Sequence, residues 1–343
     1  MIVTHFNLQY QLAVYYSTKN HIQLTHRLIN RTMNVIQRSG KHMFKYFCLF
    51  FCLWVSLSVA AESQTSAKVS LHVLGVTQDA GYPQLNCYQS HCLPGWEDPL
   101  KRKWATALAV IDEQQQQKFL FDATPDIREQ MYQLHLLAPD ERFDLAGIFL
   151  THGHMGHYTG LMHLGREAAG TQDVPVYVMP RFKAFLQNHG PWSQLVTLQN
   201  IQLQDLSAGQ ASTLTPNLEV TPLLVPHRDE FTETVGYLIK GPSRTALFIP
   251  DIDKWSQWDD DIRDWIKRVD FALLDATFFA NGEIPNRDMA EIPHPFVSES
   301  MALFKDLSPE DKAKIHFIHF NHSNPLIDPH SEAADAVRKA GFQ

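Results

Sequence analysis

The sequence has little cysteine and no excess of positive charge. Its 343 residues include 4 cysteines, and 29 lysines and arginines stand against 37 aspartates and glutamates, which gives a formal net charge of -8. An acidic chain lacks the broad cationic surface that binds nucleic acids or anionic membranes, so we expect neither as a general partner. Hydrophobic residues make up 44% of the chain, which indicates a folded protein with a real core rather than a disordered one.

A long hydrophobic run lies near the N-terminus, at residues 43–61, and reads MFKYFCLFFCLWVSLSVAA. Lys45 precedes the apolar stretch, which ends in small residues suited to cleavage after Ala60 or Ala61. This pattern predicts a signal peptide, because a membrane anchor needs about 20 apolar residues and the run is shorter. We interpret residues 1–42 as a non-native upstream extension. The sequence thus predicts a periplasmic or secreted protein, which contacts a membrane only if the signal stays uncleaved.

Removal of this signal would leave two cysteines, Cys87 and Cys92, in the segment GYPQLNCYQSHC. A local disulfide is the first interpretation, because thiols of exported proteins tend to pair. A structural zinc site is the second interpretation. It ranks lower, because the two cysteines and His91 supply three obvious ligands where structural zinc takes four.

From residue 69 onward, short apolar runs alternate with longer amphipathic stretches. Runs rich in β-branched or aromatic residues predict strands at 69–76, 106–111, 118–121, 145–150, 174–179, 218–225, 235–239, 246–249, 271–274 and 315–318. Amphipathic stretches predict helices at 125–137, 160–169, 181–189, 255–268 and 295–306. This alternation is typical of a single α/β domain with large sheets covered by helices, which we place at residues 69–343.

An aspartate or a histidine follows five of the predicted strands directly. The segments are FLFDATPD, IFLTHGHMGH, LFIPDID, LLDATFF and HFIHFNH. Ligands of α/β proteins tend to bind at the carboxyl edge of the strands, so we expect these side chains to share one site.

The segment THGHMGH places three imidazoles, those of His152, His154 and His157, within six residues of a loop. A solvated loop would favour other polar residues, and a core would not accept three polar rings without partners. Neutral imidazole is the commonest metal ligand of proteins, so the segment predicts a metal site. Gly153 and Gly156 allow the loop to curl around one centre.

This segment resembles the H-x-H-x-D-H signature of the metallo-β-lactamase superfamily, and later residues match that family in order. The resemblance covers most of the chain from Val69 onward and implies a four-layer αββα sandwich. The stretches GYPQLNC, LLDATFF and HFNHSNP more narrowly resemble the pyrroloquinoline quinone biosynthesis protein B family.

The resemblance also implies roles for individual residues. Metal ligands would be His152, His154, His157, His227, Asp251 and His319. Asp122 would support the histidine loop, and we interpret Asp275 and His322 as further supporting residues on their positions alone. Asp251 and His294 would be catalytic, His294 as the proton donor, with capping of the following helix as the alternative for His294.

The sequence departs from the family pattern at Gly156, where the signature has an aspartate that ligates a second metal ion. We therefore favour one ion, although two are an alternative in which His322 substitutes for the lost ligand. On this interpretation, an aspartate introduced at position 156 is expected to raise the metal content.

The expected activity is hydrolysis of a small-molecule ester, lactone or phosphodiester by metal-bound water, whose pKa the metal lowers to about 7. Zinc is the leading candidate, although histidine and carboxylate ligands also accept manganese or iron. An iron-dependent oxygenase related to pyrroloquinoline quinone biosynthesis and a non-catalytic metal-binding protein are the alternatives. The predicted export argues against the oxygenase, because cofactor assembly of that kind is expected in the cytoplasm.

Overall fold

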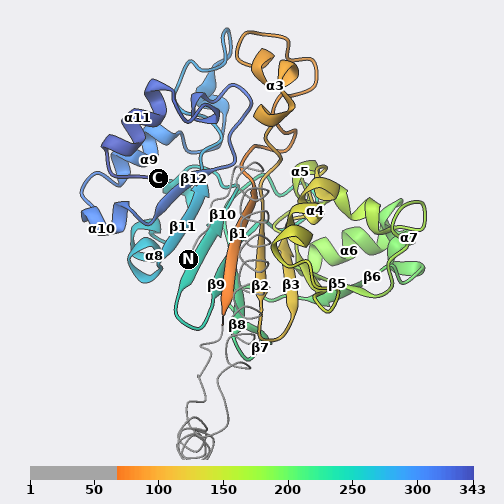
Figure 1. The fold of residues 1–343 in the computed structure, drawn as a ribbon. Coiled ribbons are helices and arrows are strands. Elements are labelled where there is room, and N and C mark those ends of the chain that lie inside the picture. The colour runs from red at the N-terminus through yellow and green to blue at the C-terminus, as the bar shows by residue number, and fades with distance from the viewer. Residues whose placement is uncertain (1–67) are drawn as a thin grey trace, which may run out of the picture. The chain divides into compact units, whose positions relative to one another are not determined.

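The structure is a computed structural model that describes residues 68–343 (Figure 1), so the predicted upstream extension and signal peptide lie outside the described residues. Within the described part, no helix is long and apolar enough to span a membrane. The strands form two six-stranded sheets, with the strand orders β1-β2-β3-β4-β5-β6 and β12-β11-β10-β9-β8-β7.

Each sheet combines an antiparallel part with a parallel part. The first contains β1 Val69–Gly75, β2 Ala107–Asp112, β3 Gln117–Phe121, β4 Asp144–Phe149, β5 Val174–Val178 and β6 Ile201–Asp205. The second contains β7 Ser212–Thr215, β8 Leu218–Leu224, β9 Val235–Lys240, β10 Thr245–Ile249, β11 Phe271–Asp275 and β12 Ile315–Ile318. Strands β3 to β6 run parallel, as do β10, β11 and β12. Parallel strands bring their carboxyl ends to one edge of the sheet.

Helices cover the outer face of each sheet (Figure 1). The α-helices are α3 Leu93–Glu97, α4 Ile127–Leu137, α5 Met155–Tyr158, α6 Pro180–Asn188, α7 Trp192–Thr197, α8 Ile262–Arg268, α9 Val297–Leu303, α10 Pro309–Lys312 and α11 Glu332–Lys339. Short 3-10 helices are η1 Pro99–Lys101, η2 Thr159–Leu164, η3 Trp255–Gln257, η4 Met289–Glu291 and η5 Pro325–Ile327. Helices α4, α6 and α7 lie on the first sheet, and α8, α9 and α11 lie on the second (Figure 1), which gives the predicted αββα sandwich.

The two sheets are joined by an aromatic core. The ring of Phe121 stacks on Phe149 at 5.0 Å and meets Tyr237 edge-on at 5.5 Å, so β3 and β4 of one sheet contact β9 of the other. All three side chains are fully buried, and such aromatic groups bury a large area each. This core holds the two sheets face to face, and therefore fixes how their strand ends meet.

The predicted elements differ from the structure in several places, and helices α3, α7, α10 and α11 were not predicted. Strands β6 and β7 were missed because they are short and rich in polar residues, as in the segments IQLQD and STLT. The helix predicted at 160–169 is the 3-10 helix η2 followed by turns. The helix predicted at 255–268 is divided into η3 and α8, because Asp261 accepts a hydrogen bond from the backbone N–H of Arg263 and starts a new helix there.

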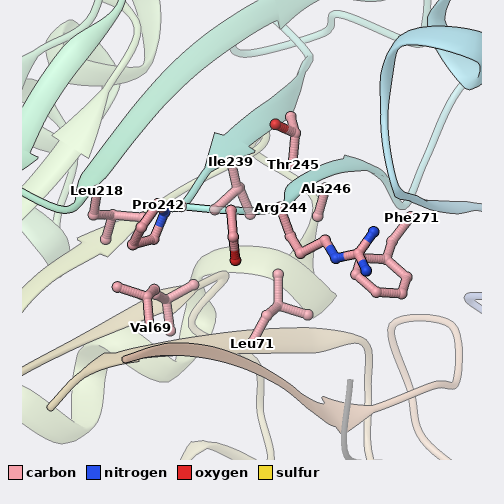
Figure 2. Close-up of a pocket in the computed structure, with 12 residues that line it drawn as sticks. Val69, Leu71, Leu218, Ile239, Pro242, Arg244, Thr245, Ala246 and Phe271 are labelled. Carbon is pink, nitrogen blue, oxygen red and sulfur yellow. The ribbon is translucent and has the colours of Figure 1, made fainter. Parts of the chain in front are cut away.

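A pocket lies at the end of the sandwich where β1, β10 and β11 begin (Figure 2). Apolar side chains such as Val69, Leu71 and Ile239 line it, and its charged residue Arg244 is paired with Asp270 at 2.6 Å. Asp251, predicted to bind metal, and Asp275, predicted to support it, lie at the opposite ends of β10 and β11. This pocket is therefore separate from the candidate site.

Candidate metal centre

The carboxyl ends of strands from both sheets meet at one edge of the sandwich. Asp122 follows β3, His152 comes shortly after β4, Asp251 comes shortly after β10, Asp275 ends β11 and His319 follows β12. Asp122 and His319 both have a φ of 67°, a left-handed backbone that is uncommon outside glycine. Such conformations persist where the surrounding structure fixes them, often at functional sites. The five strand ends singled out in the sequence thus lie together.

The first cluster of potential ligands consists of His152, His154, His227 and Asp251, whose ligand atoms lie within 4.8 Å of one another. Nε2 of His152 is 3.0 Å from Nδ1 of His154 and 3.3 Å from Oδ2 of Asp251. Nε2 of His227 and Oδ1 of Asp251 are 3.3 Å apart, and both atoms are buried without a hydrogen-bond partner. Buried polar atoms normally have hydrogen-bond partners, so these two unpartnered atoms fit the ligands of a metal ion. Three imidazoles and a carboxylate are ligands that zinc accepts.

The nitrogen of each ring that faces away from this cluster has its own partner. Nδ1 of His227 lies 3.0 Å from Oδ1 of Asp253, and Nε2 of His154 lies 3.0 Å from Oε2 of Glu230. Such contacts fix the tautomer and the orientation of metal-binding imidazoles. Neither acidic residue was predicted, although both follow a predicted ligand closely in the chain.

The second cluster consists of Asp79, His157 and His319, again within 4.8 Å. Nε2 of His157 is 3.1 Å from Oδ1 of Asp79 and 3.3 Å from Nε2 of His319. Oδ2 of Asp251 lies 3.8 Å from Nε2 of His157 and 3.9 Å from Nε2 of His319, so this carboxylate stands between the two clusters. Behind the cluster, Oδ2 of Asp122 is 2.7 Å from Nδ1 of His157.

Asp79 was not among the predicted residues, although it follows strand β1 as the predicted aspartates follow theirs. The alternative that His322 replaces the lost ligand is wrong in position. His322 groups with Cys87, His91 and Cys92, and its ring lies 5.6 Å from that of His91. The carboxylate next to Gly156 comes from Asp79 instead.

His294 and Asp275 adjoin the first cluster. Nδ1 of His294 lies 2.9 Å from Oδ2 of Asp275 and 3.0 Å from Oδ1 of Asp251. Burial lowers the pKa of His294, but the charges of these two carboxylates outweigh it and raise the pKa well above its usual value. Asp275 is itself held by the backbone N–H groups of Ile252 and Thr277. Asp275 therefore fixes the imidazole beside the cluster.

The buried carboxylate and imidazole of the first cluster are in the forms that ligate metals. Burial raises the pKa of Asp251, but the neighbouring charges of His227, His294 and His319 lower it well below the usual range. Burial lowers the pKa of His152, and so does the charge of His157. An ionised carboxylate and a neutral imidazole can bind a cation without first losing a proton.

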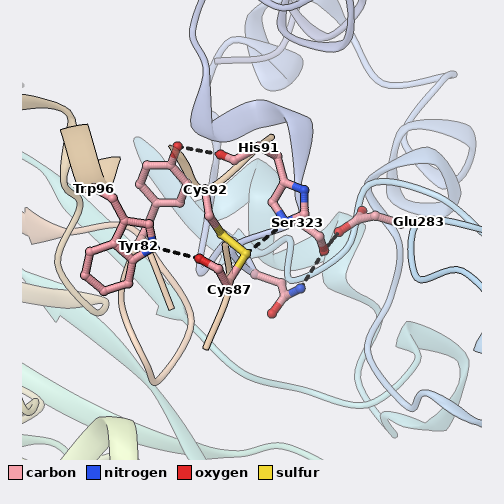
Figure 3. The surroundings of a disulfide bond; sticks show 8 residues. Tyr82, Cys87, His91, Cys92, Trp96, Glu283 and Ser323 are labelled. Atoms are coloured by element: carbon pink, nitrogen blue, oxygen red, sulfur yellow. Dashed lines mark hydrogen bonds between the residues drawn. A yellow bond between two sulfur atoms is a disulfide. The ribbon is translucent and has the colours of Figure 1, made fainter. Parts of the chain in front are cut away.

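Of the two interpretations of the cysteines, the structure contains the disulfide between Cys87 and Cys92 (Figure 3). Its segment is fixed by side chains on either side: the indole of Trp96 donates to the carbonyl of Cys87 at 2.6 Å, and the hydroxyl of Tyr82 donates to the carbonyl of His91 at 2.6 Å. The ligand atoms of Cys87, His91, Cys92 and His322 also lie within 4.8 Å of one another, so the fourth donor that the zinc interpretation lacked is present beside the disulfide.

This chain is similar to a known protein family and to curated proteins. A family model described as "Beta-lactamase superfamily domain" matches residues 117–317, more than half of the chain. "Coenzyme PQQ synthesis protein B" of Methylobacterium sp. (strain 4-46) is 24% identical over 294 residues, which cover 79% of this chain and 95% of that protein.

Two solved structures show the same fold. The crystal structure of Zn(2+)-bound PqqB from Methylobacterium extorquens has a TM-score of 0.66 at 21% identity, and covers 80% of this chain and 97% of that chain. A diphosphatase from the PhnP family has a TM-score of 0.52 at 22% identity, and covers 75% of this chain and 88% of that chain. At these identities, the likeness concerns the fold alone.

Proposed function

Because the chain belongs to the metallo-β-lactamase superfamily, we propose that it is a metal-dependent hydrolase whose primary ion is held by His152, His154, His227 and Asp251. One observation carries the proposal. Two of the four converging ligand atoms, Nε2 of His227 and Oδ1 of Asp251, are buried and make no hydrogen bond of good geometry, although Nδ1 of His294 lies 3.0 Å from Oδ1. Leaving such groups unsatisfied destabilises a fold, and a bound cation would satisfy both.

A divalent ion at this position supplies Lewis acidity and makes water acidic enough to act as a nucleophile near neutral pH. The protein's own residues do the rest. Asp253 and Glu230 orient the imidazoles of His227 and His154 from behind. His294, held by Asp275, is placed to give a proton to the leaving group.

Zinc is the proposed ion, since three imidazoles and one carboxylate suit it and a structure of similar fold is described as zinc-bound. The same donor atoms also accept manganese or iron. The proposed substrate is a small-molecule ester, lactone or phosphodiester. We propose no nucleic-acid partner, because the chain carries a net charge of -8.

We expect the purified protein to hydrolyse at least one member of a panel of esters, lactones and phosphodiesters. Dialysis against a chelator should abolish turnover, and added zinc should restore it, because the reaction needs the cation that the four donors hold. Metal content measured before and after dialysis shows whether turnover follows the amount of bound metal. Turnover that persists in fully metal-depleted protein would contradict the hydrolase proposal.

A second candidate, an iron-dependent oxygenase, is favoured by the relatives named for coenzyme PQQ synthesis, which the chain matches over 95% of their length. The two candidates differ in their co-reactant. Oxygen consumption by iron-loaded protein, without hydrolysis of the panel, would favour the oxygenase. Bound metal with neither activity would indicate a metal-binding protein.

We also propose that the protein is exported, and the disulfide between Cys87 and Cys92 supports this, since structural disulfides persist in oxidising compartments. Expression from Met43 should yield a mature protein that begins at Ala61 or Glu62. N-terminal sequencing of the periplasmic fraction measures this directly. A membrane-bound product that still starts at residue 43 would show that the segment is an anchor.

A further inference from the structure

We propose that Asp79 takes over the role of the aspartate missing at Gly156, and that the protein thereby holds a second divalent ion between Asp79, His157 and His319, beside Asp251. This inference rests on the metal centre proposed above, but not on the identity of the substrate. It replaces the single ion that Gly156 suggested in the sequence.

Asp79 fills the space that a side chain at position 156 would need. A β-carbon built on Gly156 would lie 2.2 Å from Oδ1 of Asp79 and 2.3 Å from its Cα. Both distances are far below van der Waals contact, so a side chain at 156 and the present Asp79 exclude each other. The space that a side chain at position 156 would occupy is thus filled by the carboxylate of Asp79, which belongs to another segment of the chain.

Asp79 lies beside Gly156 because the segment after strand β1 continues the pairing of the backbone. Thr77 forms a parallel bridge with Phe320, whose N–H donates to the carbonyl of Val76 at 2.8 Å and whose carbonyl accepts from the N–H of Gln78 at 2.8 Å. Phe320 directly follows His319. The backbone pairing therefore sets Asp79 and His319 side by side, and it joins the first sheet to the second.

Oδ1 of Asp79 is oriented toward the cluster rather than satisfied within the protein. The side-chain amide of Gln78 donates to Oδ2 of Asp79 at 2.8 Å, whereas Oδ1 is buried without a hydrogen-bond partner. Oδ1 lies 3.1 Å from Nε2 of His157, but not in hydrogen-bond geometry. A carboxylate with one oxygen held by a hydrogen bond and the other without one is suited to bind a cation.

The two imidazoles of the cluster are also arranged for an ion. Their Nε2 atoms face each other at 3.3 Å, while the opposite nitrogens are engaged by Asp122 at 2.7 Å and by the hydroxyl of Thr277 at 2.9 Å. Partners at Nδ1 leave Nε2 of each ring to face inward, as they do in rings that bind metal. A simple ion pair between Asp79 and His157 would explain one of these contacts, whereas a cation explains all three donor atoms together.

Metal counting tests the inference, with Asp79→Asn as the variant, because asparagine keeps the shape and removes the charge. Zinc-saturated wild-type protein, freed of loose metal by gel filtration, should hold two ions per chain by elemental analysis. Asp79→Asn should hold one. Its second ion should bind more than roughly 100-fold more weakly in a competition titration, since even partners behind the ligands change affinity by 10–100-fold.

Asp98→Asn is the matched control, because Asp98 lies on the same connection between β1 and β2, is half-buried, and its side chain accepts a hydrogen bond from the N–H of Leu100, which asparagine can also accept. It should keep two ions. Thermal melts of all the proteins show whether they are folded. If Asp79→Asn melts early, Asp79→Ser gives the same count with a smaller polar side chain.

A wild-type protein that saturates at one ion per chain would overturn the inference, and so would a folded Asp79→Asn variant that retains two. These results are independent of catalysis. Two ions in a protein that hydrolyses nothing would contradict the hydrolase proposal and leave the role of Asp79 intact.

Discussion

His152→Ala and His227→Ala are each expected to abolish tight metal binding at the first cluster and, with it, hydrolysis. Each removes one of four converging donors and takes away one of the imidazoles that face Asp251, which is 3% exposed. We expect metal affinity to fall more than roughly 100-fold, beyond the 10–100-fold that partners behind the ligands contribute. Elemental analysis and a competition titration with a chromogenic chelator measure the effect.

His189→Ala is the matched control for these variants, because His189 is exposed and its Nδ1 contacts only the carbonyl of Phe185, at 3.0 Å. It should bind metal as the wild type does. Occupancy of the first cluster at the wild-type level in both His152→Ala and His227→Ala would mean that these imidazoles are not ligands.

Gly156→Asp is expected to destabilise the protein and to lower its metal content, which reverses the expectation drawn from the sequence. The new side chain would collide with Asp79, including its Cα at 2.3 Å. That backbone cannot move freely, because its neighbour Gln78 is hydrogen-bonded to Phe320. Overpacking of this kind costs about 1–3 kcal/mol. The added carboxylate would also lie beside the ionised Asp79, and like charges repel.

Gly156→Ala separates the two causes, because it introduces the same β-carbon without the charge. Urea unfolding gives the loss of stability of each variant, and metal analysis gives the occupancy. We expect both variants to be destabilised, and the aspartate variant to be destabilised more. The prediction is contradicted if Gly156→Asp is as stable as the wild type and holds two ions. The loop that carries Asp79 would then move aside without a measurable loss of stability.

Local patterns in the sequence are informative about this fold, because they report what one segment does by itself. An apolar run followed closely by His152, Asp251 or His319 predicts both the strand and the strand end at which the side chain lies. The parallel pairing of β10, β11 and β12 then brings such ends together, as the strand pattern predicted.

The contacts that the sequence did not reveal join segments far apart in the chain. Asp79 and Gly156 exclude each other sterically, yet nothing near Gly156 indicates which distant residue fills its space. Glu230 supports His154 from a different loop for the same reason. His322 was predicted as a substitute ligand at the site, but the chain turns after His319 and places His322 beside His91.

The division of the ligands between the two sheets has a consequence for the order of assembly. Asp79, His152, His154 and His157 follow strands of the first sheet, whereas His227, Asp251 and His319 follow strands of the second. Neither half of the chain carries a complete set for either ion. During synthesis the four donors of the first cluster are all present once Asp251 has emerged, whereas the second cluster is complete only once His319 follows β12. Fragments split between β6 and β7 should likewise bind zinc tightly only after they are mixed and associate, which makes the metal a reporter of the docking of one sheet on the other.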